Sequence, residues 1–516
     1  MILFTLAMGF FPGPVQSGFG ALADVMRYDI GWVFTLGATA MLVFAAGVGA
    51  ILMFFGVAEP INHDAVPPTI GTFHFGFQLW AIQVVPGLAF AYFTYKRNLP
   101  PRASSAFQPF IGDRIHGPWG KAIDIMAIVA TVFGIAVSIG LGAMQINAGL
   151  TYVYGVPMQG WIQALTIALI TGAGLTSVLL GMDKGVNRLS YLNILMAVAL
   201  MLFVLMWGAT MDTFRGVVET AGRYLYNLPV LSFFNDFSGS GQWTGDWTVF
   251  YWAWAVTWSP FVGMFIAKIS RGRTIREFVI ATIGMPTSFV IVWMSVWGIS
   301  GIVQDQATAT SGVSGELVET VVDDGNIEAA LFQFLQGYPA FGFVAVFTLI
   351  VIVIFFVTSM DSGALVMDGI ASGHEDAGPK RQRVFWTVSI GAVCTVILVT
   401  AGENGFNAMQ EVIIVIGLPL MILTFIMMLS LLQAVREDYG SARPIRTRQW
   451  RRVLPLEEFH RRAQEEPSAT EEFVICSEYE VGTEPDFDTH QPQTWHWQRG
   501  DGTVEENDAY QKGQQS

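Results

Sequence analysis

Three tryptophans in one short apolar segment are the residues of this sequence best suited to hold an organic ligand. Trp252, Trp254 and Trp258 lie within residues 247–278. The face of an indole ring attracts an organic cation, and each such contact contributes about 0.5 to 2 kcal/mol. The segment breaks at Pro260 and ends in four cations, Lys268, Arg271, Arg273 and Arg276. These features predict a membrane span that is unwound in its middle, lined with aromatic rings and anchored in the cytoplasm.

Two adjacent hydroxyl groups are a second candidate set. Thr358 and Ser359 lie deep in an apolar run, where hydroxyls are not needed for solubility. A sodium ion inside a membrane needs several oxygen ligands, and hydroxyls with free carbonyls supply them without adding a charge. The alternative is that each hydroxyl bonds the backbone carbonyl four residues before it. The residues alone leave both interpretations open.

Other chemistries find no support in the spacing of the residues. No set of histidines, cysteines and carboxylates has the sequence spacing of a transition-metal site. No nucleophile and general base can be recognised as a catalytic pair from their spacing, and there is no phosphate-binding loop. We therefore predict no enzyme activity, no cofactor and no nucleic-acid partner. Among the acids in or near apolar runs, Asp361 is expected either to tune the sodium site or to carry a proton. Asp368 and Glu59 lie near run ends and are expected to be solvated.

The composition is that of a membrane protein. Hydrophobic residues make up 53% of the 516 residues and charged residues 13%, which is about half the charge of a soluble domain. Mean hydropathy is +0.49. Most of the net charge of -14 lies after residue 453 and so does not indicate a cationic partner. Apolar runs long enough to cross a bilayer lie near residues 31–57, 71–95, 121–150, 158–181, 186–211, 246–268, 277–303, 340–372, 383–401 and 406–435.

The loops between these runs differ sharply in charge. If the loop after 71–95 is cytoplasmic, the inside loops and the start of the tail hold 20 lysines and arginines, whereas the outside loops hold only Arg215 and Arg223. Because positive residues collect on the cytoplasmic side, we predict a multi-pass protein of the plasma (inner) membrane. The N-terminus of the ten-span core and the C-terminal tail are then both cytoplasmic.

Ten spans in two sets of five must run in opposite orientations, which is the arrangement of an inverted repeat. The first span of each set is then expected to be broken, and the first run carries Gly47, Gly49 and Gly56. Glycine lets a backbone leave the helix, although glycines in membrane helices also serve close packing. The predicted domains are an incomplete N-terminal segment at 1–30, a five-helix repeat at 31–211, an external interfacial helix or loop at 212–245, a second repeat at 246–435, and a cytoplasmic tail at 436–516 that is basic, then acidic and largely disordered.

Several separate blocks, in order, resemble the betaine/choline/carnitine transporter family. They are FAAGVG and MFFGVAEP in the first run, FGIAVSIGLGAMQINAGL at 133–150, KGVNRLSYLN at 184–193, the tryptophan segment at 247–278, and FFVTSMDSGALVMD at 355–368. The resemblance implies an all-α polytopic membrane protein with a LeuT-type 5+5 inverted-repeat core of ten transmembrane helices. A short N-terminal apolar segment precedes this core. The resemblance also implies homotrimers and contact with membrane lipid.

The resemblance implies a substrate site that departs from the family pattern. Family members hold quaternary ammonium groups in a cage of aromatic rings. Here Trp80 is kept, Phe75 replaces a tryptophan, Gln83 replaces a tyrosine, and the paired tryptophans become Trp254-Ala255. The predicted substrate-binding residues are Gly47, Gly49, Phe75, Trp80, Trp252, Trp254 and Trp258. The substrate is then either bulkier than glycine betaine or differently shaped, or it is not a quaternary ammonium compound. For Trp252, packing is the alternative to a contact with substrate.

The resemblance also implies ion sites. The hydroxyl pair closes a sodium site against the unwound first span, with the ligands Ala45, Val48, Phe355, Thr358 and Ser359. A second candidate ion site has Ser138 and Phe261. The implied function is secondary active transport, sodium-coupled uptake by alternating access of a small zwitterionic or quaternary-ammonium solute such as glycine betaine, choline or carnitine. The alternatives are a sodium-independent exchanger of the same fold and a non-transporting membrane sensor.

Overall fold

The computed structural model describes residue 9 and residues 12–26, 51–63, 68–180, 183–239, 241–309, 314–373 and 379–440, together with three short strands beyond residue 470. The chain divides into two units, Met1–Arg446 and Thr447–Ser516. Within the described ranges, nine helical segments are long and apolar enough to cross a membrane: Thr69–Lys96, Pro118–Tyr154, Gly160–Leu179, Ser190–Trp207, Thr244–Ile269, Ile275–Thr308, Phe341–Ser372, Lys380–Ala401 and Gly405–Asp438. They coincide with nine of the ten predicted runs. The first run, 31–57, is described only from residue 51 onward.

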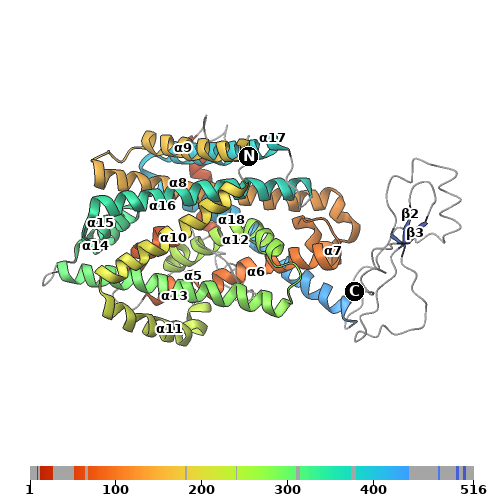
Figure 1. Ribbon diagram of the computed structural model, residues 1–516, viewed down its shortest axis with the longest axis horizontal. Helices are drawn as coiled ribbons and strands as arrows, with labels where there is room; N and C mark the ends of the chain where they lie inside the picture. The colour runs from red at the N-terminus through yellow and green to blue at the C-terminus, as the bar shows by residue number, and fades with distance from the viewer. Residues whose placement is uncertain are drawn as a thin grey trace. The chain divides into compact units, whose positions relative to one another are not determined.

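The first half of unit 1 is helical almost throughout its described part (Figure 1). After α2 (Pro12–Asp24), the helices are α4 (Ile51–Asn62), α5 (Thr69–Phe75), α6 (Phe77–Ala91), α7 (Gln108–Ile111), α8 (Pro118–Tyr154), α9 (Gly160–Leu180) and α10 (Asp183–Trp207). The π-helical turn η3 (Tyr92–Lys96) extends α6, and the 3-10 turns η4 (Ala103–Phe107) and η5 (Gly112–His116) lead to α8.

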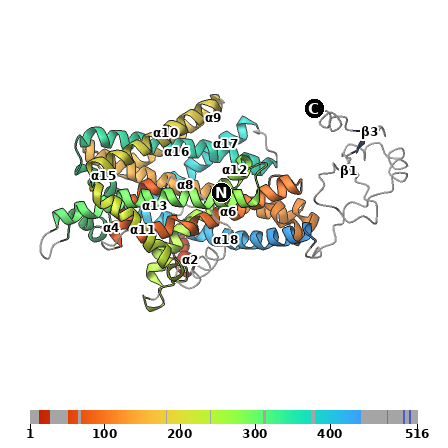
Figure 2. The same ribbon diagram turned by 60° about the horizontal axis from the view of Figure 1, so that its bottom comes forward.

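The second half begins with α11 (Thr210–Ser232), the helix predicted within 212–245. It lies beside α13 in both views (Figures 1 and 2). The remaining helices are α12 (Phe250–Ile269), α13 (Ile275–Thr308), α14 (Glu316–Val318), α15 (Ala330–Gln336), α16 (Phe341–Ser372), α17 (Lys380–Ala401) and α18 (Gly405–Asp438). Short turns join them: η6 (Phe237–Gly239), η7 (Thr244–Val249) before α12, η8 (Glu319–Asp323), η9 (Ile327–Ala329) and η10 (Gly402–Asn404).

Helices of the two halves pack against each other in a reciprocal pattern. In the first half α4 packs against α13 of the second, and in the second half α12 packs against α6 of the first. The third span of one half, α8, packs against that of the other, α16, and α9 packs against α17 in the same way. Such reciprocal pairing is what two repeats related by a two-fold axis in the membrane plane produce. It supports the 5+5 architecture.

The α6–α12 crossing is close because glycine lies on both sides of it. A methyl group at Gly263 would lie 2.8 Å from the backbone nitrogen of Gly87, so a side chain cannot be placed there without moving the helices apart. Small residues allow this approach in membrane helices, where packing replaces the hydrophobic driving force. The crossing fixes the tryptophan-bearing part of α12 against the aromatic residues that α5 and α6 carry.

Unit 2 contains one small antiparallel sheet among its described residues. Its strands are β1 (Ile475–Cys476), β2 (His496–Gln498) and β3 (Val504–Glu506), in the order β1-β2-β3. Ile475 pairs with Trp497, and Trp497 pairs with Glu505.

Candidate functional site

A single hydroxyl group organises two of the predicted cage tryptophans. Ser138 on α8 accepts hydrogen bonds from Nε1 of Trp254 at 2.8 Å and from Nε1 of Trp258 at 3.2 Å, both on α12. The same hydroxyl donates to the carbonyl of Gly134 at 2.9 Å. The two indole rings are thereby held one helical turn apart with their polar edges toward α8. Both rings are buried.

Phe75 and Trp254 lie in one aromatic cluster with Tyr251. Phe75 contacts Tyr251 edge-on with ring centroids 4.9 Å apart, and Phe55 contacts Tyr251 and Trp254 at 4.9 and 6.1 Å. The structure therefore brings together predicted site residues from α5 and α12. Trp80 on α6 is 9% exposed, and its indole nitrogen has no hydrogen-bond partner among the described residues.

Trp252 is placed differently from the other tryptophans. Its side chain is fully buried and its ring packs on Phe73 of α5 at 5.5 Å between centroids. On a helix, residues 252 and 254 point in directions about 200° apart, so Trp252 faces away from the Ser138-bonded pair. This position favours the packing role, and a contact of Trp252 with substrate stays a prediction.

Gln83 is held at the backbone of the tryptophan segment. Its amide nitrogen donates to the carbonyl of Ala255 at 2.7 Å. Its amide oxygen is buried and has no hydrogen-bond partner in the described part of the chain. A buried acceptor of this kind is costly unless a donor reaches it, about 1 to 3 kcal/mol. Gln83 thus offers a hydrogen-bond acceptor where the family pattern has an aromatic ring.

Three of the five predicted sodium ligands, Phe355, Thr358 and Ser359, lie on α16. The hydroxyl of Thr358 donates toward the carbonyls of Ile354 at 2.9 Å and Phe355 at 3.0 Å, and Ser359 follows half-buried. The bond to Ile354 is the packing alternative expected for a buried threonine, and it leaves the hydroxyl oxygen's lone pairs available. The ligands Ala45 and Val48, and the substrate residues Gly47 and Gly49, lie outside the described residues.

A buried asparagine on α10 contacts the same stretch of α16. With its amide oriented to satisfy both partners, Asn193 donates to the carbonyl of Val351 at 3.1 Å and accepts from the N–H of Phe355 at 3.3 Å. In an α-helix these two backbone groups are hydrogen-bonding partners four residues apart, so the Asn193 amide contacts both ends of one step of α16. The motif KGVNRLSYLN contains this residue, but nothing in the sequence connects it to Phe355.

The second candidate ion site is occupied by internal hydrogen bonds. Ser138 uses its proton and both lone pairs on Gly134, Trp254 and Trp258. Phe261 contacts Trp258 edge-on at 5.6 Å between ring centroids. In this conformation the Ser138 oxygen has no lone pair left for a cation, so an ion there would have to displace an indole. An ion site at Ser138 and Phe261 stays a prediction.

The expectation for two of the acids is wrong. Glu59 and Asp368 are both fully buried rather than solvated. Glu59 lies in the last turn of α4, and its Oε1 is 2.5 Å from Nδ1 of His74 on α5. Proximity to the end of an apolar run suggested solvent, but α5 folds back over α4 and covers this end. Asp361 is half-buried beside the hydroxyl pair.

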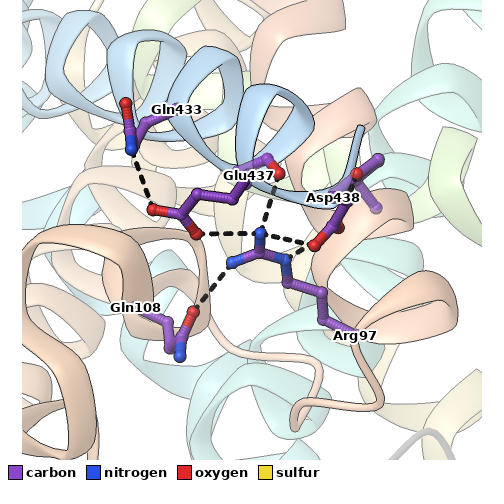
Figure 3. Close-up of polar contacts among 7 residues, drawn as sticks. Arg97, Gln108, Gln433, Glu437 and Asp438 are labelled. Atoms are coloured by element: carbon purple, nitrogen blue, oxygen red, sulfur yellow. Dashed lines mark hydrogen bonds and ion pairs between the residues drawn. The ribbon is translucent and has the colours of Figure 1, made fainter. Parts of the chain in front are cut away.

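Arg97, just after η3, connects the end of one span to the end of the last. Its guanidinium donates to Asp438 Oδ1 at 2.8 Å, to Glu437 Oε2 at 3.0 Å and to the carbonyl of Ala434 at 2.7 Å (Figure 3). A further bond reaches Gln108 at 3.1 Å. The side chains of Arg97 and Glu437 are 4% and 11% exposed. Burial lowers the pKa of Arg97, but hydrogen bonds to the two acids more than offset it, so the net change is upward.

Replacing Arg97 with glutamine is expected to lower the free energy of unfolding by about 3 kcal/mol, because two partly buried carboxylates lose the buried cation that pairs with them. Thermal melting in detergent measures the change as a lower Tm. Arg215→Gln is the matched control, because Arg215 is 81% exposed and pairs with Asp212 at 3.5 Å. A surface pair of this kind contributes about 0 to 1 kcal/mol. Equal melting of the two variants would contradict a stabilising role for the Arg97 cluster.

The fold is that of a polytopic, all-α membrane protein with an aromatic cluster where its two halves meet. The chain belongs to the betaine/carnitine/choline family of transporters, whose model matches residues 34–440. The predicted family and fold class are thereby confirmed. Because the family and the relatives are transporters, the prediction that the protein is not an enzyme is confirmed as well.

Three relatives show how far the similarity extends. The chain is 46% identical over 429 residues to the ectoine/glycine betaine/proline transporter EctP of Corynebacterium glutamicum. The aligned region covers 80% of this chain and 69% of the relative. The chain is 39% identical over 414 residues to a glycine betaine transporter of Acinetobacter baylyi, covering 77% and 61%. It is 38% identical over 426 residues to the high-affinity choline transport protein of Escherichia coli, covering 79% and 61%. The chain thus spans between 61 and 69% of the length of these relatives.

Proposed function

We propose that the protein takes up a small zwitterionic or quaternary-ammonium osmolyte across the plasma (inner) membrane by alternating access, in symport with sodium. The observation that carries the proposal is the pair of indoles, Trp254 and Trp258, that Ser138 holds in fixed orientation on α12. Rings fixed in this way can bind the cationic group of a betaine or choline without first losing side-chain freedom. The relatives' names, which include ectoine, glycine betaine, proline and choline, agree with this substrate class.

Gln83 narrows the substrate class. Its buried amide oxygen needs a donor, and glycine betaine has no N–H or O–H group. Ectoine and proline carry N–H groups, and choline carries a hydroxyl. A solute that combines positive charge with a donor would satisfy both the indoles and Gln83. We propose such a solute as the preferred substrate, with glycine betaine as a weaker one.

Sodium coupling rests on the Thr358 hydroxyl and the Phe355 carbonyl, which lie 3.0 Å apart on α16. Two oxygens at this separation can share one sodium ion with further ligands from the first span. The inward movement of one sodium ion releases about 2.3 kcal/mol of free energy per 100 mV of membrane potential. Each tenfold gradient adds about 1.4 kcal/mol. Together they support accumulation of a neutral solute on the order of 500-fold.

The membrane environment belongs to the same proposal. Several spans leave wide apolar faces outside the protein core: within the most apolar windows of α9 and α10, 33% and 28% of residues are buried. Lipid or neighbouring copies cover such faces in a bilayer, which agrees with a homotrimer in contact with membrane lipid. The excess of lysine and arginine in the predicted inside loops supports the further proposal that the core N-terminus and the tail are cytoplasmic.

Uptake into proteoliposomes tests the proposal. We expect an inward sodium gradient to drive uptake of labelled glycine betaine, and unlabelled ectoine, proline or choline to compete more strongly than unlabelled betaine. Uptake that depends on internal solute and ignores sodium would instead identify an exchanger. Binding without flux would identify a sensor. If none of these solutes enters or competes, the proposed substrate class is wrong.

A further inference from the structure

Three potential metal ligands lie together at the end of α4, outside the proposed substrate and sodium sites. Glu59 and His63 are one helical turn apart, and His74 is in the last turn of α5. One ligand atom from each lies within 4.8 Å of the other two. The sequence spacing alone does not single out this group, because His74 reaches Glu59 only through the packing of α5 against α4.

The distances allow a metal to bind with small side-chain movements. His74 Nδ1 is 2.5 Å and His63 Nε2 is 3.8 Å from Glu59 Oε1. In a tetrahedral zinc site with ligand bonds near 2.0 to 2.1 Å, neighbouring ligand atoms are about 3.3 Å apart. The observed separations lie on either side of this value. An ion would therefore move Glu59 away from His74 and draw His63 inward, with no movement of a helix.

The group also has buried polar atoms whose hydrogen bonding is incomplete. Glu59 Oε2 and His63 Nε2 are buried and make no hydrogen bond of good geometry among the described residues. The buried Tyr251 hydroxyl is the nearest alternative partner, because it interacts with the Glu59 carboxylate. The side chain of Glu59 is 0% exposed and that of His63 is 9% exposed. Buried polar atoms without partners destabilise a fold. A bound cation would satisfy both at once.

Thr248 gives His74 the orientation that a metal ligand needs. Its Oγ1 lies 2.9 Å from Nε2 of His74, on the far side of the ring from Glu59. If Nε2–H donates to Thr248, Nδ1 presents its lone pair toward Glu59 and His63. Metal-bound histidines commonly use such a hydrogen bond to fix the ring and its tautomer. Thr248 belongs to η7, directly before α12.

A cavity gives an ion a route to the group. It has a volume of about 300 Å³ and is lined by His63, Pro60 and Thr69 together with Arg223 and Asn227 of α11. Arg223 would repel a cation, but its charge is paired with Glu219 at 2.7 Å. Two imidazoles and one carboxylate, with a fourth position open toward this cavity, form a ligand set that zinc prefers.

We propose that Glu59, His63 and His74 bind a divalent transition metal of the zinc class and that binding slows transport. The ion would tie α4 to α5 and, through Thr248, to the start of α12. The helices α4 and α12 belong to the first spans of the two repeats, and alternating access requires these repeats to move relative to each other. The effect on transport rests on the proposed function, whereas the metal site itself does not.

Zinc binding to the purified full-length protein in detergent tests the site directly. We expect ZnCl₂ titrated by calorimetry to bind the wild type at one site that His63→Leu weakens on the order of tenfold or more. His116→Leu is the matched control because His116 is exposed on η5. This variant should bind zinc with the same affinity as the wild type. Equal binding by wild type and His63→Leu would overturn the proposal and place the ion elsewhere.

Transport provides the second readout. In proteoliposomes, external ZnCl₂ should reduce uptake at least fivefold in the wild type and in His116→Leu, and much less in His63→Leu. If zinc binds at His63 but does not slow uptake, the proposed effect on transport is wrong and the metal site itself is supported. If no solute is taken up by any variant, the proposed function fails, and calorimetry still decides the metal site.

Discussion

Replacing Thr358 with valine is expected to raise the sodium concentration for half-maximal uptake by about ten- to hundredfold. Valine has nearly the shape of threonine but lacks the hydroxyl that lies 3.0 Å from the Phe355 carbonyl. A hydrogen-bonding group directed at a charge contributes about 1.5 to 3 kcal/mol, and about 1.4 kcal/mol corresponds to a tenfold change. Uptake measured over a series of sodium concentrations gives the shift.

Thr348→Val is the matched control for this variant. Thr348 lies on the same helix, is fully buried, and donates to the carbonyl of Val344 at 2.8 Å. The two valine variants therefore lose the same kind of internal hydrogen bond, and only Thr358 lies at the predicted ion site. If both change sodium dependence equally, or if neither does, the Thr358 hydroxyl is a packing group and the sodium site must be sought elsewhere.

Most of the fold could be predicted from the sequence because the bilayer imposes a simple rule. A span needs a long apolar run whose backbone is satisfied within one helix, and such runs can be read without knowing any contact. The helix of 212–245 was equally predictable from its alternating apolar and polar faces and is present as α11. The prediction that the helix is unwound at Pro260 is wrong. Here α12 runs without interruption from Phe250 to Ile269, with Pro260 inside it.

The site could be predicted only as a set of residue types. Trp254, Trp258 and Ser138 each stand out, but their shared hydrogen bonds join positions more than 110 residues apart in the chain. The same limit explains the error at Glu59. Its burial depends on α5 packing over α4, and a position near the end of an apolar run carries no information about that packing. Long-range contacts of single side chains are set by tertiary structure, which local patterns do not encode.

Replacing Ser138 with alanine is expected to raise the substrate concentration for half-maximal uptake by about tenfold or more. The variant leaves two buried indole N–H groups without their acceptor, and each unsatisfied donor costs about 1 to 3 kcal/mol. The rings of Trp254 and Trp258 would then reorient to find other partners, and the binding surface would lose its fixed geometry. Uptake measured at saturating sodium over a series of substrate concentrations gives the effect.

The sodium dependence of the same variant separates two roles for Ser138. As the acceptor for both indoles it acts through the tryptophans, so sodium affinity should stay the same while substrate affinity falls. If Ser138 is instead an ion ligand, its replacement should lower the affinity for sodium more than the affinity for substrate. Thr131→Val on α8 is the control, since the Thr131 hydroxyl donates to the carbonyl of Ala127 at 2.8 Å and, among the described residues, bonds no tryptophan. A sodium shift in Ser138→Ala that Thr131→Val lacks would favour the second ion site, and the indole pair would then have to release Ser138 when the ion binds.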